Sequence, residues 1–401
     1  MEIIKTDGKL SFFEATSIIV GHGVGAGILS VPYLASRNSI YTFVWIVVLA
    51  FIMNCLLHLM IAELSYNNGG AHFVKCLENI FKNEKFKKVF SWIVFILLGF
   101  SVCMNVCSYI TGSSVAVASI FYMIRGLEIP DEFPTNVIIL SMVFYYILVA
   151  LVVFFGLKVV GVSEKYSVFA MIGVMVILLI AVIVKHNFHS VIGEHRALTN
   201  VFGLYGMISF ALSSVISVPQ VVKGLEGDAK KIRGSIVLGI TINIVMIIAL
   251  TLITLIGSNL VTQNGAINDL SKSIGGWVSL VGYIFTLFAL STSLWANTLD
   301  LRDVVHEQTK LGLKVSWIVA SLPCLTVAIL ATFLSSTFVM FAKAASVFQI
   351  ITSLAVIVAY ALSRKKLKDS PICGAFGNLV FQILVVVFAL IATVGSVLPT
   401  V

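Results

Sequence analysis

The stretch His22-Gly23-Val24-Gly25-Ala26-Gly27-Ile28-Leu29-Ser30-Val31-Pro32 lies inside the first long apolar segment of the chain. Its alternating glycines and its proline disfavour a helix, because glycine costs roughly 1 kcal/mol and proline about 3 kcal/mol per helical position. A helix that crosses a membrane should break here. Unpaired backbone groups at mid-membrane are tolerated only where protein, a water-filled cavity or a ligand satisfies them. The break therefore predicts a binding site.

The sixth apolar segment carries a second stretch of the same kind. The tetrapeptide Ile216-Ser217-Val218-Pro219 nearly repeats Leu29-Ser30-Val31-Pro32. Corresponding interruptions in the two halves of a membrane protein indicate the substrate site of a transporter. Because the two copies lie five spans apart, an odd number, the second copy is expected to run upside down relative to the first.

The composition indicates an integral membrane protein. Of 401 residues, 59% are hydrophobic and 11% are charged, with a mean hydropathy of +1.07, whereas a soluble domain has about 25% charged residues. Each span needs about 20 apolar residues. The sequence predicts one bundle of eleven spans, near residues 13–36, 39–65, 89–124, 135–157, 162–185, 201–224, 232–257, 275–303, 313–334, 338–362 and 374–397.

The distribution of positive charge predicts the orientation, because Lys and Arg are concentrated in cytoplasmic loops. With a cytoplasmic N-terminus, twenty of the 26 Lys and Arg residues fall on the inner side, five fall on the outer side, and Lys343 lies within the tenth span. We therefore expect a multi-pass protein of the cell membrane with an extracellular C-terminus. This orientation also explains the net charge of +8 without a nucleic-acid partner.

Several polar and aromatic side chains inside the spans are candidates for a substrate pocket. Tyr109 belongs to a polar strip of the third span and is expected either to line the pocket or only to pack against neighbouring helices. Phe210 offers an apolar lid one turn before the second break. Ser213 and Ser214 place two hydroxyl groups beside that break.

The eighth span has an oxygen-rich face. Ala289, Thr292 and Ser293 are spaced i, i+3 and i+4, so they share one side of a helix. Hydroxyl groups in a membrane helix often bond back to their own carbonyls. The alternative is that this face binds a small hard cation, which prefers oxygen ligands.

Ionisable residues within spans are functional candidates by default. His22 could titrate near neutral pH, or it could hold the first break open with a hydrogen bond. Lys343 could extend to the outer surface, or it could act as a gate or fixed cation near the pocket. His58 and Glu63 in the second span are expected to pair near the inner face.

The chain resembles the amino acid–polyamine–organocation superfamily, and more closely its amino acid/auxin permease branch. The matching residues are Gly25–Tyr33 in the first span, Val218–Leu225 in the sixth, and Ser291-Thr292-Ser293 with Leu299–Asp303 in the eighth. The resemblance implies an all-α membrane protein with the leucine-transporter fold and helices 1 and 6 broken at mid-membrane. The single transporter domain, 1–401, would comprise inverted five-helix repeats at 13–185 and 201–362 and an eleventh helix at 374–397.

The resemblance also implies where an amino acid binds. Its carboxylate would meet free backbone amides where the second half of the first helix begins, since a helix start carries partial positive charge. Its amino group would meet carbonyls near the end of the first half-helix. The implied substrate site comprises His22, Gly23, Gly25, Ala26, Gly27, Tyr109, Phe210, Ser213 and Ser214.

A coupling ion follows from the same resemblance. Sodium-dependent relatives combine first-span carbonyls with a small-x-x-Ser/Thr-Ser/Thr face of the eighth span. The residues that fit are Gly21, Val24, Ala289, Thr292 and Ser293. Proton-dependent relatives often place a lysine in the fifth span, and no lysine lies between Lys165 and Lys185. Sodium is the expected ion, with no other cofactor, although His22 or Lys343 could serve protons.

Together these features predict a monomeric secondary active transporter that imports a neutral amino acid by alternating access. The expected pocket has no clear acidic residue, which argues against a cationic substrate. An enzyme would need His, Asp, Glu or Cys clustered at one depth, and the sequence shows no such cluster. The alternatives are a proton-coupled symporter or exchanger and, from another class, an amino acid sensor of the same fold. Sensors usually carry a long cytoplasmic extension, and both termini here are short.

Overall fold

The computed structural model describes residues 8–25, 27–79, 83–130, 132–185, 197–262, 266–333, 341, 355–364 and 370–397. Every regular element in these residues is a helix, in agreement with the predicted all-α protein. By length and composition, eight segments of the described residues could cross a membrane, counting the interrupted segment Leu198–Gly224 as one, and a bent pair of shorter helices makes a ninth.

The described helices match the predicted spans closely. The unbroken ones are α3 (Ile40–Asn67), α5 (Glu84–Ile124), α6 (Thr135–Phe154), α7 (Leu157–Val184), α10 (Ala229–Gly257), α12 (Trp277–Thr309) and α13 (Leu313–Thr332), followed by α15 (Leu379–Val397) near the end of the chain. Most of the predicted tenth span, including Lys343, lies outside the described residues. Its described end is helical, at Ala355–Arg364. The amphipathic stretch between Gly70 and Lys88 predicts a short helix, and α4 (Phe73–Glu78) confirms it. Neither α11 (Ala266–Ile274) nor the 3-10 turn η2 (Gly374–Gly377) was predicted from the sequence.

The first span breaks where the glycines predicted it. α1 (Phe12–Gly23) and α2 (Gly27–Ser36) differ in direction by 56°. At the break, the Val24 N–H still donates to the Val20 carbonyl at 2.9 Å, but the Gly25 N–H turns back to the Gly23 carbonyl at 2.7 Å. Pro32 does not end α2. Its lost hydrogen bond is a local cost that a helix surrounded by other helices tolerates.

The sixth span is also interrupted, as predicted. α8 (Leu198–Ala211) is followed by the 3-10 turn η1 (Val215–Ser217) and by α9 (Val218–Gly224). Pro219 is the second residue of α9, a position where the backbone N–H has no acceptor within the helix. The proline is therefore compatible with the start of this half-helix, and the non-helical residues 212–214 lie between α8 and η1.

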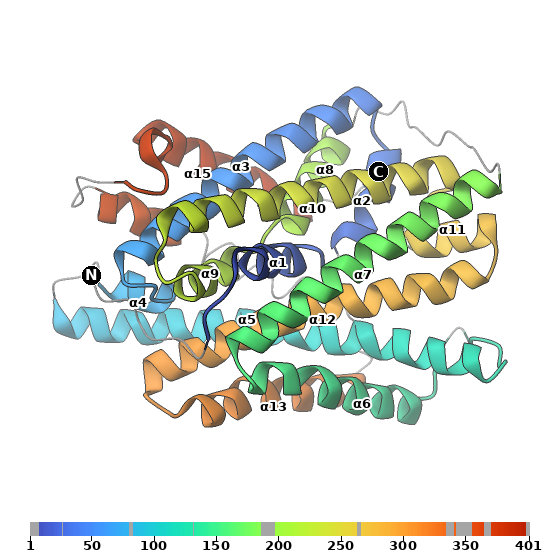
Figure 1. The fold of residues 1–401 in the computed structure, drawn as a ribbon, viewed down its shortest axis with the longest axis horizontal. Helices are drawn as coiled ribbons and strands as arrows, with labels where there is room; N and C mark the ends of the chain where they lie inside the picture. Colours follow the sequence, from blue (N-terminus) through green and yellow to red (C-terminus); the bar gives the residue numbers. More distant parts are fainter. Residues whose placement is uncertain are drawn as a thin grey trace.

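The two broken spans form the centre of the bundle (Figure 1). α1 packs against α10 on one side and against α7 and α12 on the other. α6 and α13 lie together at one edge of the molecule, and α3 and α15 lie together at the opposite edge. Both breaks are therefore enclosed by intact helices, which excludes lipid from their backbone.

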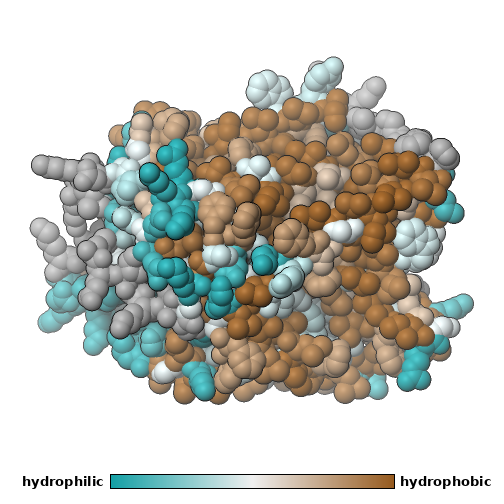
Figure 2. Space-filling model, viewed as in Figure 1, coloured by the Kyte–Doolittle hydropathy of each residue, from teal (hydrophilic) through white to brown (hydrophobic). Residues whose placement is uncertain are grey.

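The face of the bundle seen in Figure 2 is apolar over a broad area. On α6 the exposed side chains Leu140, Phe144, Ile147, Leu148 and Leu151 recur at helical spacing and form one stripe. A stripe of this kind is suited to contact with lipid tails. The fold thus presents apolar side chains outward and keeps its polar groups among the central helices.

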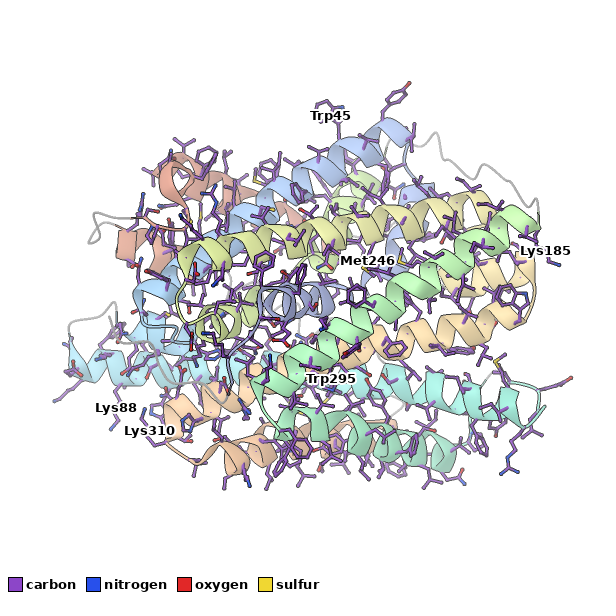
Figure 3. The ribbon with its side chains drawn as sticks, viewed as in Figure 1. Trp45, Lys88, Lys185, Met246, Trp295 and Lys310 are labelled. Atoms are coloured by element: carbon purple, nitrogen blue, oxygen red, sulfur yellow. The ribbon has the colours of Figure 1, made fainter. Side chains whose placement is uncertain are left out.

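Charged side chains at the two ends agree with the predicted grouping of the loops. Lys88 and Lys310, both assigned to the inner side, lie at one end of the molecule, and Lys185, assigned to the outer side, lies at the other (Figure 3). We call the end that holds Lys88 and Lys310 the lysine-rich end.

The predicted pairing of His58 with Glu63 is wrong. The two residues are five positions apart on α3, which separates them by about 140° around the helix. Glu63 is fully buried and faces the segment before α15 instead. Its carboxylate accepts hydrogen bonds from the Tyr360 hydroxyl at 3.0 Å, the Cys373 N–H at 2.9 Å, the Ile372 N–H at 3.3 Å and the Ser370 hydroxyl, and it lies 3.4 Å from the Arg364 guanidinium.

This buried carboxylate should contribute strongly to stability. Replacing Glu63 by Ala leaves three buried donors without an acceptor, and each such donor costs about 1–3 kcal/mol. We expect the free energy of unfolding to fall by roughly 3 kcal/mol or more, measured by thermal unfolding in detergent. Glu84→Ala is the matched control, because the Glu84 side chain is 82% exposed. Equal melting temperatures for the two variants would contradict the assignment.

Candidate functional site

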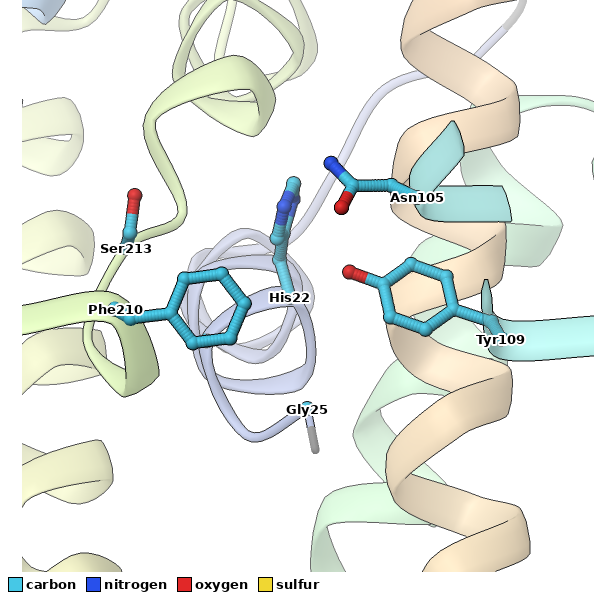
Figure 4. Close-up of a pocket in the computed structure, with 7 residues that line it drawn as sticks. His22, Gly25, Asn105, Tyr109, Phe210 and Ser213 are labelled. Carbon is cyan, nitrogen blue, oxygen red and sulfur yellow. The ribbon is translucent and has the colours of Figure 1, made fainter. Parts of the chain in front are cut away.

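A cavity of about 20 Å³ lies between the two breaks. Its lining comes from the first break, from α5 and from the second break, and consists of His22, Gly23, Gly25, Asn105, Tyr109, Phe210 and Ser213. His22 lies in the middle, and the rings of Phe210 and Tyr109 lie on opposite sides of it (Figure 4). The tyrosine hydroxyl points toward His22. Six of the residues implied by the resemblance therefore meet at one place.

The size of the cavity limits what it accommodates in this conformation. A cavity needs about 10–15 Å³ to hold a single water molecule. A cavity of about 20 Å³ therefore has room for about one water. An amino acid requires more space. Phe210 and Tyr109, which face each other across the cavity, would have to move apart to admit it.

The other residues of the implied site are placed differently. Gly27 is the first residue of α2, and a Cβ atom there would lie 2.9 Å from the Phe210 ring, so glycine allows the two breaks to approach. Ser214 is directed to α3 and does not line the cavity. Ala26 lies outside the described residues. Asn105 belongs to the polar strip of the third span but was not among the implied site residues, although its position four residues before Tyr109 puts it on the same helical face.

His22 links the two broken spans to α12. Its Nδ1 lies 2.6 Å from the Ser217 hydroxyl, and its Nε2 lies 3.4 Å from the Asn297 side-chain amide. Because the amide nitrogen can only donate, Nε2 is the acceptor and Nδ1 donates to Ser217. This geometry supports the interpretation that His22 holds the first break by hydrogen bonding.

His58 satisfies the backbone of the second break. Its Nε2 accepts from the Ser214 N–H at 2.9 Å and lies 3.1 Å from the Ser214 hydroxyl, and its Nδ1 lies 2.7 Å from the Asn54 carbonyl. A backbone N–H only donates and a carbonyl only accepts, so the proton of this neutral ring is on Nδ1. Sequence reasoning missed this role, because no local motif connects His58 with a residue 156 positions away.

The residues expected to hold sodium are brought together from α1 and α12. The Ser293 hydroxyl donates to the carbonyls of Gly21 at 3.4 Å and His22 at 3.2 Å. The Thr292 hydroxyl donates to the Ala289 carbonyl at 2.9 Å, and Val24 directly follows α1. The surroundings are rich in oxygen, and the buried carboxylate of Glu164 on α7, which has no hydrogen-bond partner among the described residues, lies beside them. This donor set fits a hard cation.

An ionic cluster joins α9 to α12 at the lysine-rich end. The Lys223 ammonium of α9 lies 2.6 Å from the Glu307 carboxylate of α12. His72, which precedes α4, donates its backbone N–H to Glu307 at 3.2 Å, and its Nδ1 lies 2.7 Å from the Asp300 carboxylate. Asp303 is also near, 3.9 Å from Lys223 and 3.5 Å from the His72 ring. The cluster therefore holds the second broken span against an intact helix.

The stability of this cluster should depend on pH. Burial lowers the pKa of His72, as does nearby Lys223, but the carboxylates of Glu307 and Asp300 outweigh both and raise the pKa from 6.5 to about 9. Because its pKa is raised in the folded state, protonated His72 stabilises the fold. This stabilisation is fully present below pH 6.5 and is lost as the pH rises through about 9. We expect the melting temperature to fall over this interval, and to fall less for His72→Gln. Parallel pH profiles would contradict this role of the imidazolium.

Two solved structures share the architecture. Mhp1, a nucleobase-cation-symport-1 family transporter in a closed conformation with bromovinylhydantoin bound, matches with a TM-score of 0.69 at 12% identity, over 98% of this chain and 92% of that one. MhsT in complex with L-phenylalanine matches with a TM-score of 0.61 at 14% identity, over 98% of this chain and 100% of that one. Both have the leucine-transporter fold, which confirms the predicted fold class.

The sequence itself matches a family profile over almost its whole length. No curated protein matches the chain. The profile of the tryptophan/tyrosine permease family matches residues 9–396. This match confirms the expected superfamily and, with the fold, indicates a transporter and not an enzyme. The chain belongs to the tryptophan/tyrosine permease family.

Proposed function

We propose that this secondary amino acid transporter imports a neutral aromatic substrate, tryptophan or tyrosine, by alternating access coupled to sodium. The observation that carries the proposal is the cavity where the two helix breaks meet between Phe210 and Tyr109. The family supports the class of substrate. MhsT, a structure of similar fold, holds L-phenylalanine.

The backbone around the cavity suits the charged ends of an amino acid. α2 begins at Gly27, and the first N–H groups of a helix have no partner within it and carry partial positive charge. They would receive the carboxylate. α1 ends at Gly23, and the last carbonyls of a helix carry partial negative charge. They would receive the ammonium group, so one break can bind both ends of a zwitterion.

The side chains around the cavity favour a neutral, aromatic substrate. No Asp, Glu, Lys or Arg is among the residues that the structure places in the cavity lining. Phe210 and Tyr109 offer two rings, and aromatic pairs gain about 0.5–1.5 kcal/mol beyond the burial of their area. If the two rings move apart, the ring of a substrate could replace their mutual packing.

Alternating access would require the ionic cluster at the lysine-rich end to open. The Lys223–Glu307 contact joins α9 to α12 and would close that end while it is intact. We infer that this end faces the cytoplasm, with the C-terminus outside the cell membrane, because most of the Lys and Arg residues are assigned to it. The proposal includes a monomer of the amino acid/auxin permease branch, with inverted repeats at 13–185 and 201–362 and an extra helix at 374–397.

The proposal predicts a defined pattern of uptake. The full-length protein is reconstituted into liposomes and supplied with radiolabelled tryptophan, tyrosine, lysine or glutamate under an imposed sodium or proton gradient. We expect sodium to drive uptake of tryptophan or tyrosine, and lysine and glutamate to be poor substrates and competitors. Equal uptake driven by protons without sodium would overturn the coupling, and binding without uptake would favour a sensor.

A substitution at the first break provides a second test. A Cβ atom on Gly25 would lie 2.9 Å from the Ser293 hydroxyl, so a leucine side chain there must enter the cavity or displace α12. We expect Gly25→Leu to fold but to lose uptake. Gly173→Leu on α7 is the matched control, because a Cβ atom at Gly173 meets nothing within 4 Å. Unaltered uptake by the Gly25 variant would refute the proposed site.

A further inference from the structure

Glu164 on α7 is a buried carboxylate that makes no hydrogen bond to the part of the chain that the structure describes. Its exposed fraction is 0%, and neither of its carboxylate oxygens has a hydrogen-bond partner among the described residues. An ionised carboxylate that is isolated from water and from partners is strongly disfavoured. Glu63, the other fully buried glutamate described above, has five groups around it. The lack of partners at Glu164 therefore calls for a chemical explanation.

The carboxylate of Glu164 points to the junction of α1 and α12. A Cβ atom placed on Gly21 would overlap the Glu164 Oε2 atom and would also lie 2.9 Å from the Thr292 Cβ. The absence of a side chain at Gly21 thus allows the carboxylate to reach the backbone of α1, just before the break. α7 packs against both α1 and α12, so the position of the carboxylate is fixed by two helices.

The groups nearest this carboxylate offer oxygen atoms and no described positive charge. Thr292 directs its hydroxyl proton to the carbonyls of Phe288 and Ala289, and Ser293 directs its proton to the carbonyls of Gly21 and His22. These hydroxyl protons therefore do not neutralise Glu164, while the oxygen lone pairs of both residues remain available. Carboxylate, carbonyl and hydroxyl oxygens are ligands that hard cations prefer.

We propose that Glu164 is an anionic ligand of the sodium site, which is then formed by three helices, α1, α7 and α12. The inference rests on the proposed function, because the site is the one assigned to the coupling ion. One carboxylate gives the site a single negative charge, which matches a monovalent cation. Binding of sodium would satisfy Glu164 and connect the broken span to two intact helices, so the ion would stabilise this packed arrangement.

The test measures ion binding without transport. The full-length protein in detergent is titrated with NaCl against choline chloride at constant ionic strength, and thermal unfolding and binding of radioactive sodium are recorded. We expect sodium to raise the melting temperature of the wild type. Glu164→Gln should weaken sodium binding by about tenfold or more, since even residues that only position metal ligands contribute about 10–100-fold to affinity.

A matched control separates this effect from the loss of any buried carboxylate. Asp269 on α11 is 2% exposed and accepts two hydrogen bonds from Thr262, so Asp269→Asn should leave the sodium response unchanged. If Glu164→Gln does not fold, Glu164→Asp provides the answer, because its shorter carboxylate should retain a weakened response. Wild-type affinity in a folded Glu164 variant would overturn the inference.

The remaining outcomes distinguish the inference from the proposed function. If sodium drives uptake by the wild type but Glu164→Gln binds sodium with wild-type affinity, the proposed function holds and Glu164 is not a ligand of the ion. A wild-type protein that does not respond to sodium, and that acid stabilises more than it stabilises Glu164→Gln, would show that Glu164 holds a proton. This outcome would overturn both the ligand and sodium coupling.

Discussion

The constraint on which this structure depends is that every polar backbone group inside a membrane must find a partner. Intact helices meet it internally, but the two central spans are interrupted and cannot. At the second break the His58 ring accepts the Ser214 N–H, and at the first break Ser293 donates to the carbonyls of Gly21 and His22. Asn243 of α10 donates to the Ile19 carbonyl of α1. Side chains of intact helices thus supply hydrogen bonds to backbone groups at the breaks and beside them.

This replacement is possible only because small residues allow the helices to approach. A Cβ atom on Gly23 would collide with the Asn243 amide, one on Gly27 with the Phe210 ring, and one on Gly21 with Glu164. The glycines that weaken the helix also permit the contacts that stabilise the break. In the proposed function, the same arrangement offers backbone groups to a substrate and the Glu164 carboxylate to an ion, so structural and functional requirements meet in the same few residues.

Charges are used differently in the middle and at the end of the bundle. At the lysine-rich end, Lys223, His72 and Glu307 form a compact cluster of opposite charges between α9 and α12. Glu164 lies beside the first break, and the described residues give it no such partner. A cluster that is internally satisfied can close one end of the transporter, whereas an unsatisfied group can respond to a bound ion. This difference separates the structural charges from the group that we associate with coupling.

The sequence alone determined the membrane class, most of the spans and the position of both breaks, because hydrophobicity, glycine and proline act locally along the chain. It also indicated most of the residues that line the cavity. The tertiary structure decided which groups satisfy the breaks. His58 was predicted to face Glu63 but faces Ser214, and Glu164 was not singled out at all. Such contacts depend on how each helix is rotated about its axis and on which distant helix packs beside it, and neither is encoded in a local pattern.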